Sequence, residues 1–219
     1  MANDENKVLI ITGGQIDEAF LQECVTNEAY SMIITADHGL LMADRLKLPL
    51  DFIVGDFDSV PERILEQYRK ISTPIKKFPT EKDKTDTEIA IELALLHNAT
   101  SIDIIGATGS RLDHVLANIH LLMLPMQLNV KAHILDPNNK IYLKKEDFKV
   151  NKNEQYGNFL SLMPLSGNVT GLSMIGFKYP LKSITLSPGS SLCISNEIVD
   201  EEAIVEFTEG ILIVFETKD

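Results

Sequence analysis

The sequence predicts an α/β fold with a parallel sheet in its first half, followed by an antiparallel β-sandwich in its second half. Up to about residue 125, short apolar runs alternate with segments of helical spacing, which is typical of a parallel sheet covered by helices. From about Val130 onward, short apolar runs are separated by turn residues, which indicates antiparallel strands. We therefore expect two domains, residues 1–127 and 128–219.

The expected elements of the first half follow one another in a regular order. We expect strands at 7–12, 31–36, 50–54 and 101–106, and helices at 16–27, 39–47, 61–70, 111–124 and from Asp86 onward. Thr85 and Glu88 fit a capping box, which predicts a helix start at Asp86. Pro61 suits a first helical position, and Pro125 closes the last helix.

The second half contains shorter apolar runs with turn signals between them. The expected strands lie at 130–136, 140–144, 159–165, 183–187, 203–207 and 211–216. The turns read "DPNNK", "LSGN", "SPGSS" and "TEG". Gly, Pro and Asn in such turns separate strands of a sandwich or barrel.

Composition excludes several classes of function. The formal net charge of −12 disfavours non-specific binding of nucleic acid, because an acidic chain repels phosphate backbones. The apolar runs are too short to span a membrane, and the polar N-terminus does not resemble a signal peptide. Two cysteines provide neither a disulfide framework nor a zinc site, so we expect a cytoplasmic protein.

The stretch "VGDFDSV", residues 54–60, places two aspartates just after an expected strand. Ligands of open α/β sheets bind beyond the carboxyl ends of the strands. In extended chain, residues i and i+2 point the same way, so Asp56 and Asp58 can converge on a divalent cation. A solvated Asx turn accounts for the pair equally well.

A second acidic stretch, "EKDKTDTE", precedes and opens the helix expected at Asp86. An acid in the first turn simply suits the helix dipole, which is the plain structural explanation. Asp83, however, is flanked by Lys82 and Lys84. Carboxylates interleaved with lysines at a helix start can hold a metal ion and phosphate oxygens together.

Two further stretches, "TADHGL" and "GATGSRLDH", also follow expected strands. Taken singly, the first reads as a plain turn, and the second is a glycine-rich turn without a P-loop or dinucleotide signature. Taken together, the stretches bring Asp repeatedly to the sheet edge where this architecture binds ligands. That pattern favours magnesium-assisted transfer of a phosphorus group, with a carboxylate or His handling the proton of the nucleophile.

The motifs resemble those of the thiamin pyrophosphokinase family. They are "ADHGL" (36–40), "VGDFDS" (54–59), "KDKTD" (82–86), "GSRLDH" (109–114) and "SSLCISNE" (190–197), in the family's order and over most of the chain. The resemblance implies a nucleotide-binding α/β domain and a thiamin-binding, dimerising β-sandwich. It also implies transfer of pyrophosphate from ATP to thiamin, dependence on Mg²⁺ or another divalent ion, and a homodimer.

The same resemblance implies roles for individual residues. The metal ligands would be Asp56, Asp58 and Asp86, and the ATP site would include Asp37, Gly39, Lys82, Asp83, Thr85 and Gly109. The catalytic residues would be Arg111, Asp113 and His114, with Asp113 assisting the thiamin hydroxyl. The thiamin-side segment would present Ser191, Ser195 and Asn196, which can face the ATP site of the partner subunit.

The sequence departs from the family pattern at three points. His38 stands where the family usually has Gly, and Cys193 lies in a segment that often reads Gly. The chain has no Trp, on which some members stack thiamin, and Phe177 or Tyr179 could take that role.

Two other functions use the same residues. A metal-dependent phosphohydrolase would use water as the acceptor, and a non-catalytic nucleotide sensor would bind ATP without turnover. AMP release that depends on thiamin separates the kinase from both.

Overall fold

The computed structural model describes residues 6–58, 60–70, 73–77 and 83–219, and the chain divides into two compact units, 1–137 and 138–219. The first unit contains β1 (Lys7–Ile11), α1 (Glu18–Asn27), β2 (Met32–Ala36), α2 (Gly39–Arg45), β3 (Phe52–Gly55), α3 (Glu62–Lys70), β4 (Ile75–Lys77), α4 (Asp86–Leu96), β5 (Ser101–Ile105), α5 (Leu112–Leu121), α6 (Met123–Gln127) and β6 (Lys131–Leu135). The second contains β7 (Asn139–Lys144), β8 (Phe148–Asn151), β9 (Phe159–Pro164), β10 (Val169–Ile175), β11 (Leu181–Leu186), β12 (Glu202–Glu206) and β13 (Leu212–Thr217).

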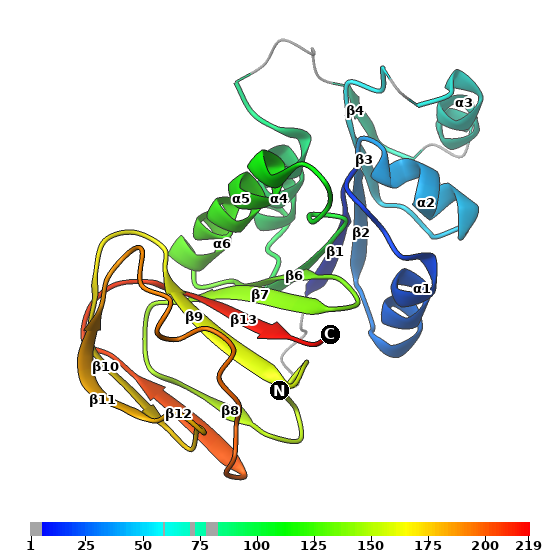
Figure 1. The fold of residues 1–219 in the computed structure, drawn as a ribbon. Coiled ribbons are helices and arrows are strands. Elements are labelled where there is room, and N and C mark those ends of the chain that lie inside the picture. The colour runs from blue at the N-terminus through cyan, green and yellow to red at the C-terminus, as the bar shows by residue number, and fades with distance from the viewer. Residues whose placement is uncertain (1–5, 59, 71–72, 78–82) are drawn as a thin grey trace, which may run out of the picture. The chain divides into compact units, whose positions relative to one another are not determined.

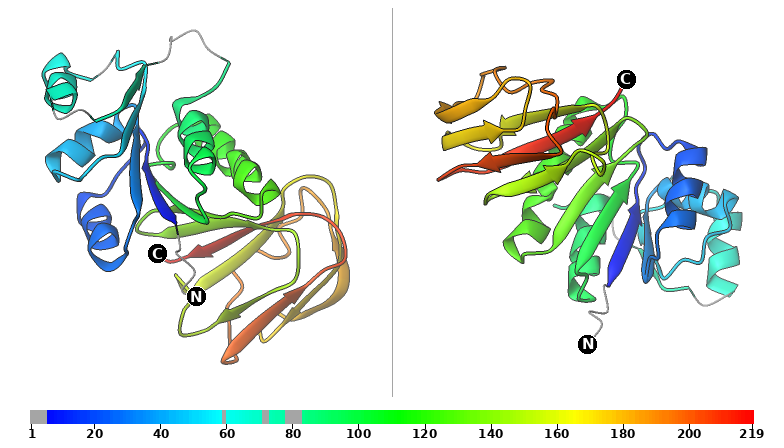
Figure 2. Two further views of the ribbon diagram at one scale, coloured as in Figure 1. Left: turned by 180° about the vertical axis from the view of Figure 1, so that it is seen from behind. Right: turned by 90° about the horizontal axis from the view of Figure 1, so that it is seen from below.

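The first unit is built on a parallel sheet with the strand order β4-β3-β2-β1-β5-β6. Helices α1 and α2 cover one face of this sheet, and α4, α5 and α6 cover the other (Figures 1 and 2). The predicted α/β fold is therefore confirmed. The strand order reverses between β1 and β5, which is the switch point where such sheets open a crevice for ligands.

Burial explains why the strands read as unbroken apolar runs. Residues 8–11 of β1 are fully buried, because helices cover both faces of the sheet. On one face, Leu21 of α1 and Ala43 of α2 join Leu9 and Ile33 in a single apolar cluster. The packed sheet holds its strand ends, and the loops that leave them, at one edge.

The start of α4 agrees with the capping box in the sequence. Thr85 lies before the helix in extended conformation, and its Oγ1 accepts a hydrogen bond from the Glu88 amide at 3.2 Å. The predicted helix start at Asp86 is thereby confirmed.

As for membrane spans, none of the helices within the described residues has the length and apolar character to cross a bilayer.

The second unit is an antiparallel β-sandwich, as predicted. One layer has the strand order β7-β13-β9 and the other β11-β10-β12-β8. Apolar side chains from both layers, such as Leu162, Val214 and Leu172, form one buried core. Strands β8 and β10 are additions to the strands expected from sequence.

The boundary between the units differs from the predicted boundary at residues 127 and 128. The structure divides the chain after Pro137, because β6 pairs in parallel with β5 and so belongs to the first unit. Only Ile134 of β6 is fully buried. This partial burial makes the segment resemble a half-exposed antiparallel strand, which explains why the sequence pattern assigns it to the sandwich.

A buried charged cluster surrounds Asp103 of β5. Its carboxylate lies 2.9 Å from Lys7 Nζ and 2.9 Å from His133 Nδ1, and it accepts a hydrogen bond from the Tyr30 hydroxyl at 3.0 Å. Burial alone would raise the pKa of Asp103. The hydrogen bonds and charges of His133 and Lys7 outweigh burial and hold the pKa of Asp103 below its usual value.

We expect Asp103→Asn to lower the free energy of unfolding by about 2–3 kcal/mol at neutral pH, because a charged hydrogen-bonding partner is lost. A depressed folded-state pKa stabilises the protein above about pH 4, and this stabilisation disappears as the pH falls through the folded-state pKa. Denaturant unfolding between pH 2 and 7 should therefore show a weaker acid dependence in the variant.

Glu28→Gln provides a matched control for Asp103→Asn. Glu28 pairs with the same Lys7 Nζ at 2.8 Å, but its side chain is about half exposed. Its loss should cost less than about 1 kcal/mol. Equal stability losses in the two variants would contradict the role assigned to the buried carboxylate.

Candidate active site

A cavity of about 780 Å³ opens in the first unit at the switch point of the sheet. Its wall consists of the loop 12–15 after β1, residues 37–38 after β2, Asp56 after β3, residues 84–87 at the start of α4, the loop 106–111 after β5, and His114, Val115 and Asn118 of α5. The volume lies within the range of about 300–1,000 Å³ that is usual for cofactor and substrate sites.

The loops that follow β1 and β5 are joined by main-chain hydrogen bonds at the base of this cavity. The Gly14 amide donates to the Gly106 carbonyl, and the Gln15 amide donates to the Thr108 carbonyl, both at 2.8 Å. A Cβ on Gly14 would lie 2.2 Å from the Gly106 oxygen, so only glycine fits there. Sequence reasoning missed the loop 12–15, although the pair of glycines after the first strand was an available signal.

Asp56 and Asp58 do not continue the strand, since β3 ends at Gly55. Phe57 has φ 62°, and Asp56 Oδ1 accepts a hydrogen bond from the Asp58 amide at 3.1 Å, which makes an Asx turn. The expectation that the two aspartates lie in extended chain is therefore wrong, and the alternative of an Asx turn is the conformation present. Asp56 lines the cavity, whereas Asp58 is exposed and lies outside its lining.

Helix α4 brings a cluster of predicted residues to the cavity. Thr85 and Asp86 line it, and Thr87 joins them through a buried hydrogen bond of 2.7 Å between its hydroxyl and that of Thr12. Lys84 also lines the cavity and pairs with Glu92, and their hydrogen bond raises the pKa of Lys84.

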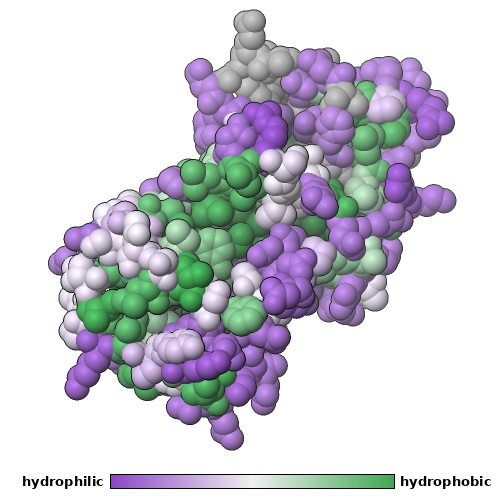
Figure 3. All heavy atoms as spheres, viewed as in Figure 1, coloured by the Kyte–Doolittle hydropathy of each residue, from purple (hydrophilic) through white to green (hydrophobic). Residues whose placement is uncertain are grey.

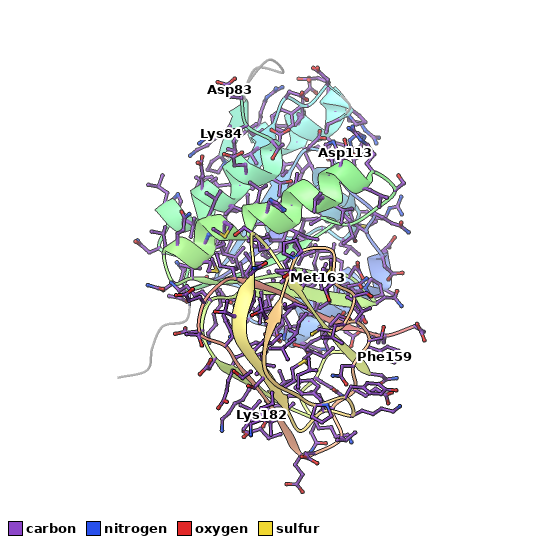
Figure 4. The ribbon with its side chains drawn as sticks, turned by 60° about the vertical axis from the view of Figure 1, so that its left-hand side comes forward. Asp83, Lys84, Asp113, Phe159, Met163 and Lys182 are labelled. Carbon is purple, nitrogen blue, oxygen red and sulfur yellow. The ribbon has the colours of Figure 1, made fainter. Side chains whose placement is uncertain are left out.

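Of the other residues predicted near α4, Asp83 is not among those that line the main cavity. Asp83 lies with Lys84 at the N-terminal end of the helix (Figure 4) and lines a separate hollow beside Lys76 and Leu96. Lys82 lies outside the described residues.

Of the three residues that follow β2, two line the cavity and the third, Gly39, does not. Asp37, with φ 50°, and His38 both line the cavity, and Asp37 Oδ2 lies 3.6 Å from His38 Nδ1. Gly39 is buried at the start of α2, where a Cβ would lie 2.1 Å from the Ile11 carbonyl oxygen. Gly39 therefore serves the packing of α2 on β1.

Helix α5 has one face that lines the cavity and another that is exposed. Arg111, His114 and Asn118 line the cavity, as does Gly109 in the preceding loop. Asp113 lies at the N-terminal end of α5 (Figure 4), its side chain is 66% exposed, and its Oδ2 lies 2.6 Å from Arg111 Nη2. The hydrogen bond from Arg111 holds the pKa of Asp113 below its usual value, which makes Asp113 a weaker base.

The predicted thiamin-side segment lies in the second unit. Ser191 and Ser195 are exposed, and Ser195 has φ 55°. Asn196 is buried, and its side chain is used within the protein. Its Oδ1 accepts from the Tyr179 amide at 3.1 Å, and its Nδ2 donates to the Tyr179 carbonyl at 2.9 Å. Asn196 therefore fixes the main chain at Tyr179.

Burial distinguishes the three residues of the second unit that are departures from the family pattern or stacking candidates. Cys193 is buried, and burial raises its pKa to about 11. Phe177 belongs to the buried core of the sandwich, whereas Tyr179 is 62% exposed. Of the two aromatic candidates, only Tyr179 can offer a ring face to a ligand.

The residues that line the cavity suit a hard divalent cation, because three of them, Asp37, Asp56 and Asp86, carry carboxylate oxygens. Within the described ranges, no three His, Cys, Asp or Glu side chains stand close enough together to hold a metal ion by themselves. The protein would therefore supply only part of the coordination shell of such an ion, as is usual for magnesium bound with substrate phosphates.

Comparisons with known proteins agree along nearly the whole chain. Residues 25–134 match the family model of the thiamin pyrophosphokinase catalytic domain, and residues 145–212 match that of the thiamin pyrophosphokinase vitamin B1 binding domain. A thiamine pyrophosphokinase of Bacillus subtilis is 33% identical over 196 residues, which cover 88% of this chain and 90% of the relative.

Solved structures show the same similarity. A crystal structure of thiamine pyrophosphokinase from Bacillus subtilis has a TM-score of 0.86 at 30% identity and covers 97% of this chain and 99% of its own. A thiamin pyrophosphokinase family protein from Enterococcus faecalis has a TM-score of 0.79 at 31% identity, with the same coverage. The loop 12–15 lies before the segment that the catalytic family model matches, so its place at the cavity comes from the structure.

Proposed function

The chain belongs to the thiamin pyrophosphokinase family, and from this premise we propose that its first unit binds ATP and a divalent metal ion in the switch-point cavity while its second unit binds thiamin. The enzyme transfers pyrophosphate from ATP to the hydroxyl of thiamin and releases AMP. The observation that carries the proposed ATP site is the meeting of Asp56, Asp86 and Arg111 around a cavity of nucleotide size.

In this proposal Asp56 and Asp86 hold the metal ion, and Asp58 reaches it from the adjoining turn. When bound, the ion would neutralise charge on the phosphates of ATP. The first turn of α4, with Thr85 as its cap, adds main-chain amides and the positive end of the helix dipole.

The remaining residues proposed for the ATP site lie in the cavity wall or next to it. Asp37 and Gly109 lie in the wall. Gly39 supports the wall from the base of α2. Lys82 and Asp83 precede α4, and we propose them for the same site by resemblance.

Arg111 and His114 are proposed to act on the reacting groups. The hydroxyl oxygen of thiamin bonds to the β-phosphorus, the bond from that phosphorus to the oxygen of AMP breaks, and AMP leaves with the electron pair. Arg111 lies in the cavity wall, where its charge suits the transferred group. His114 shares that wall and can take the hydroxyl proton.

Asp113 is proposed to act through Arg111. Their ion pair fixes the guanidinium. The lowered pKa of Asp113 disfavours it as the direct base.

Thiamin is proposed to meet the second unit at Ser191, Ser195 and Tyr179. Ser191 and Ser195 offer exposed hydroxyls, and Tyr179 offers an aromatic face for the cationic thiazolium. Asn196 holds Tyr179 in place through the two hydrogen bonds to its main chain.

We expect Tyr179→Ala to raise the KM for thiamin about tenfold, the scale of a partly desolvated cation–π contact, with little change in the KM for ATP. Tyr179→Phe keeps the ring and should behave nearly as the wild type. Steady-state kinetics with each substrate varied provide the measurement. An unchanged KM for thiamin in the alanine variant would remove Tyr179 from the site.

A homodimer built largely by the second unit, in a cytoplasmic setting, completes the proposal. Exposed apolar side chains on that unit, including Leu192, Ile194 and Val199, suit a protein interface. Cys24 and Cys193 are both free thiols, in keeping with a reducing compartment. A fully active monomer in sedimentation experiments would contradict the dimer.

The proposed function is tested by incubating the protein with ATP, Mg²⁺ and thiamin and separating the products by chromatography. AMP and thiamin diphosphate should form together and only when all three are present. Release of inorganic phosphate without thiamin would indicate a phosphohydrolase, and ATP binding without any product would indicate a sensor.

A further inference from the structure

Asn118 of α5 is a buried polar side chain in the wall of the switch-point cavity. It lies one helical turn after His114 and is 8% exposed. Its Nδ2 donates a hydrogen bond to the Ala107 carbonyl at 2.9 Å. Because a carbonyl can only accept, this bond defines which end of the amide is nitrogen and which is oxygen.

The other end of the amide, Oδ1, has no hydrogen-bond partner in the part of the chain that the structure describes. It is not sealed inside the protein either. Among the described residues, the only side-chain polar atom that is both fully buried and unpartnered is Thr35 Oγ1. The oxygen of Asn118 therefore keeps some accessible surface, and because Asn118 lines the cavity, we assign that surface to the cavity side.

The position of Oδ1 is held by the surrounding loop. Asn118 ties α5 to Ala107, and the next residue of the same loop, Thr108, donates through its hydroxyl to Asp136 Oδ2 at 2.9 Å. The main-chain bonds from Gly14 and Gln15 hold the loop from the other side. A preorganised acceptor of this kind discriminates between ligands, because leaving it unpaired in a complex costs free energy.

The chemistry of ATP limits what this acceptor can bind. Phosphate oxygens at neutral pH are acceptors themselves and cannot satisfy Oδ1. Donors are found on the nucleoside part, in the ribose hydroxyls and the amino group of adenine. Resting on the function proposed above, we infer that Asn118 Oδ1 accepts a hydrogen bond from an O–H or N–H donor of the nucleoside and that Asn118 thereby selects the nucleotide.

The test is a cycle between protein variants and nucleotides that each lack one donor. Dissociation constants are measured by calorimetry, with Mg²⁺ and without thiamin, for ATP, 2′-deoxy-ATP, 3′-deoxy-ATP and purine riboside triphosphate, which lacks the amino group. In the wild type, one analogue should bind about tenfold more weakly than ATP, a typical value for a lost hydrogen bond.

In Asn118→Leu, ATP and that same analogue should bind alike, because the acceptor is gone. Which analogue behaves in this way distinguishes a ribose hydroxyl from the adenine amino group. Asn118→Ala serves as a second variant in case leucine does not fit, and thermal melting verifies that each variant folds. Asn27→Ala, at an exposed position at the end of α1, should retain the full selectivity of the wild type.

Several results would overturn the inference. Equal binding of all four nucleotides by the wild type is one. Another is a variant that binds every nucleotide more weakly by the same factor, which indicates that Asn118 only supports the loop. A third is an Asn118 variant that keeps the nucleotide selectivity of the wild type and loses only affinity for Mg²⁺. A protein that selects among nucleotides through Asn118 but forms no thiamin diphosphate would retain this inference and refute the proposed function.

Discussion

Replacing Asp86 by asparagine is expected to reduce turnover by at least about 100-fold, the scale of losing one preorganised electrostatic group in an active site. Asp86 is the first residue of α4 and lines the cavity with Asp56. Asparagine retains the shape and a neutral oxygen but removes one charge from the proposed metal site. The measurement is the rate of thiamin diphosphate formation, together with thermal melting at increasing Mg²⁺ in the presence of ATP.

Glu18→Gln is the matched control for Asp86→Asn. Glu18 is the first residue of α1, outside the cavity, and therefore has the same relation to a helix dipole. Both changes should cost less than about 1 kcal/mol of helix stabilisation. Only Asp86→Asn should lose turnover and the melting shift induced by Mg²⁺. Near-normal turnover in Asp86→Asn would mean that this carboxylate only favours the helix start.

The same substitution at Asp58 decides how far the metal site extends. Asp58 is held next to Asp56 by the Asx turn, although it does not line the cavity. A loss of about 100-fold or more supports three carboxylate ligands. Turnover close to that of the wild type would restrict the site to Asp56 and Asp86.

Gly14→Ala is expected to abolish ATP binding and to lower the free energy of unfolding by about 1–3 kcal/mol, because the added methyl group overpacks a filled site. The new Cβ would lie 2.2 Å from the Gly106 oxygen and 2.4 Å from the Thr108 oxygen. Both contacts are with main chain, so the two loops must separate. A displacement of about 1 Å can cost about 100-fold in rate when it moves an active site.

Gly13→Ala is the matched control for Gly14→Ala, because it makes the same chemical change at the neighbouring position. A Cβ on Gly13 would meet its nearest atom, His38 Cβ, at 3.3 Å, a contact that a shift of a few tenths of an ångström relieves. Denaturant unfolding and calorimetry with ATP should show a much smaller change than in Gly14→Ala. Equal losses in both variants would contradict the role assigned to the contact between the loops after β1 and β5.

The apolar surface of the first unit was not apparent from sequence. Figure 3 shows apolar side chains gathered over α4, α5 and α6, and Leu96, Leu112 and Leu116 are among the exposed ones. In the sequence, Leu112 and Leu116 belong to a helical pattern that looks like one core face. In the folded protein, the face of α5 that carries His114 and Asn118 lines the cavity, whereas these leucines are exposed.

The strands that sequence reasoning missed have local causes. β10 contains Gly171 at φ 71°, and its pairing with β11 shifts register between Val169 and Leu172. This irregularity disrupts the alternation by which half-buried strands are recognised. β4 extends only from Ile75 to Lys77, which is too short to show a period.

The sequence by itself determined the division into an α/β part and an antiparallel part, the start of α4 and the edge of the sheet where the acidic residues gather. These features follow from local patterns, because burial on both faces, a capping box and parallel strands each leave a signature in neighbouring residues. The tertiary structure decided which residues share the cavity. It placed Asp56 in the wall and Asp58 outside it, and it brought the loop 12–15 and Asn118 to the same site. Those outcomes depend on the left-handed conformation of Phe57 and on contacts between distant loops, which short stretches of sequence do not encode.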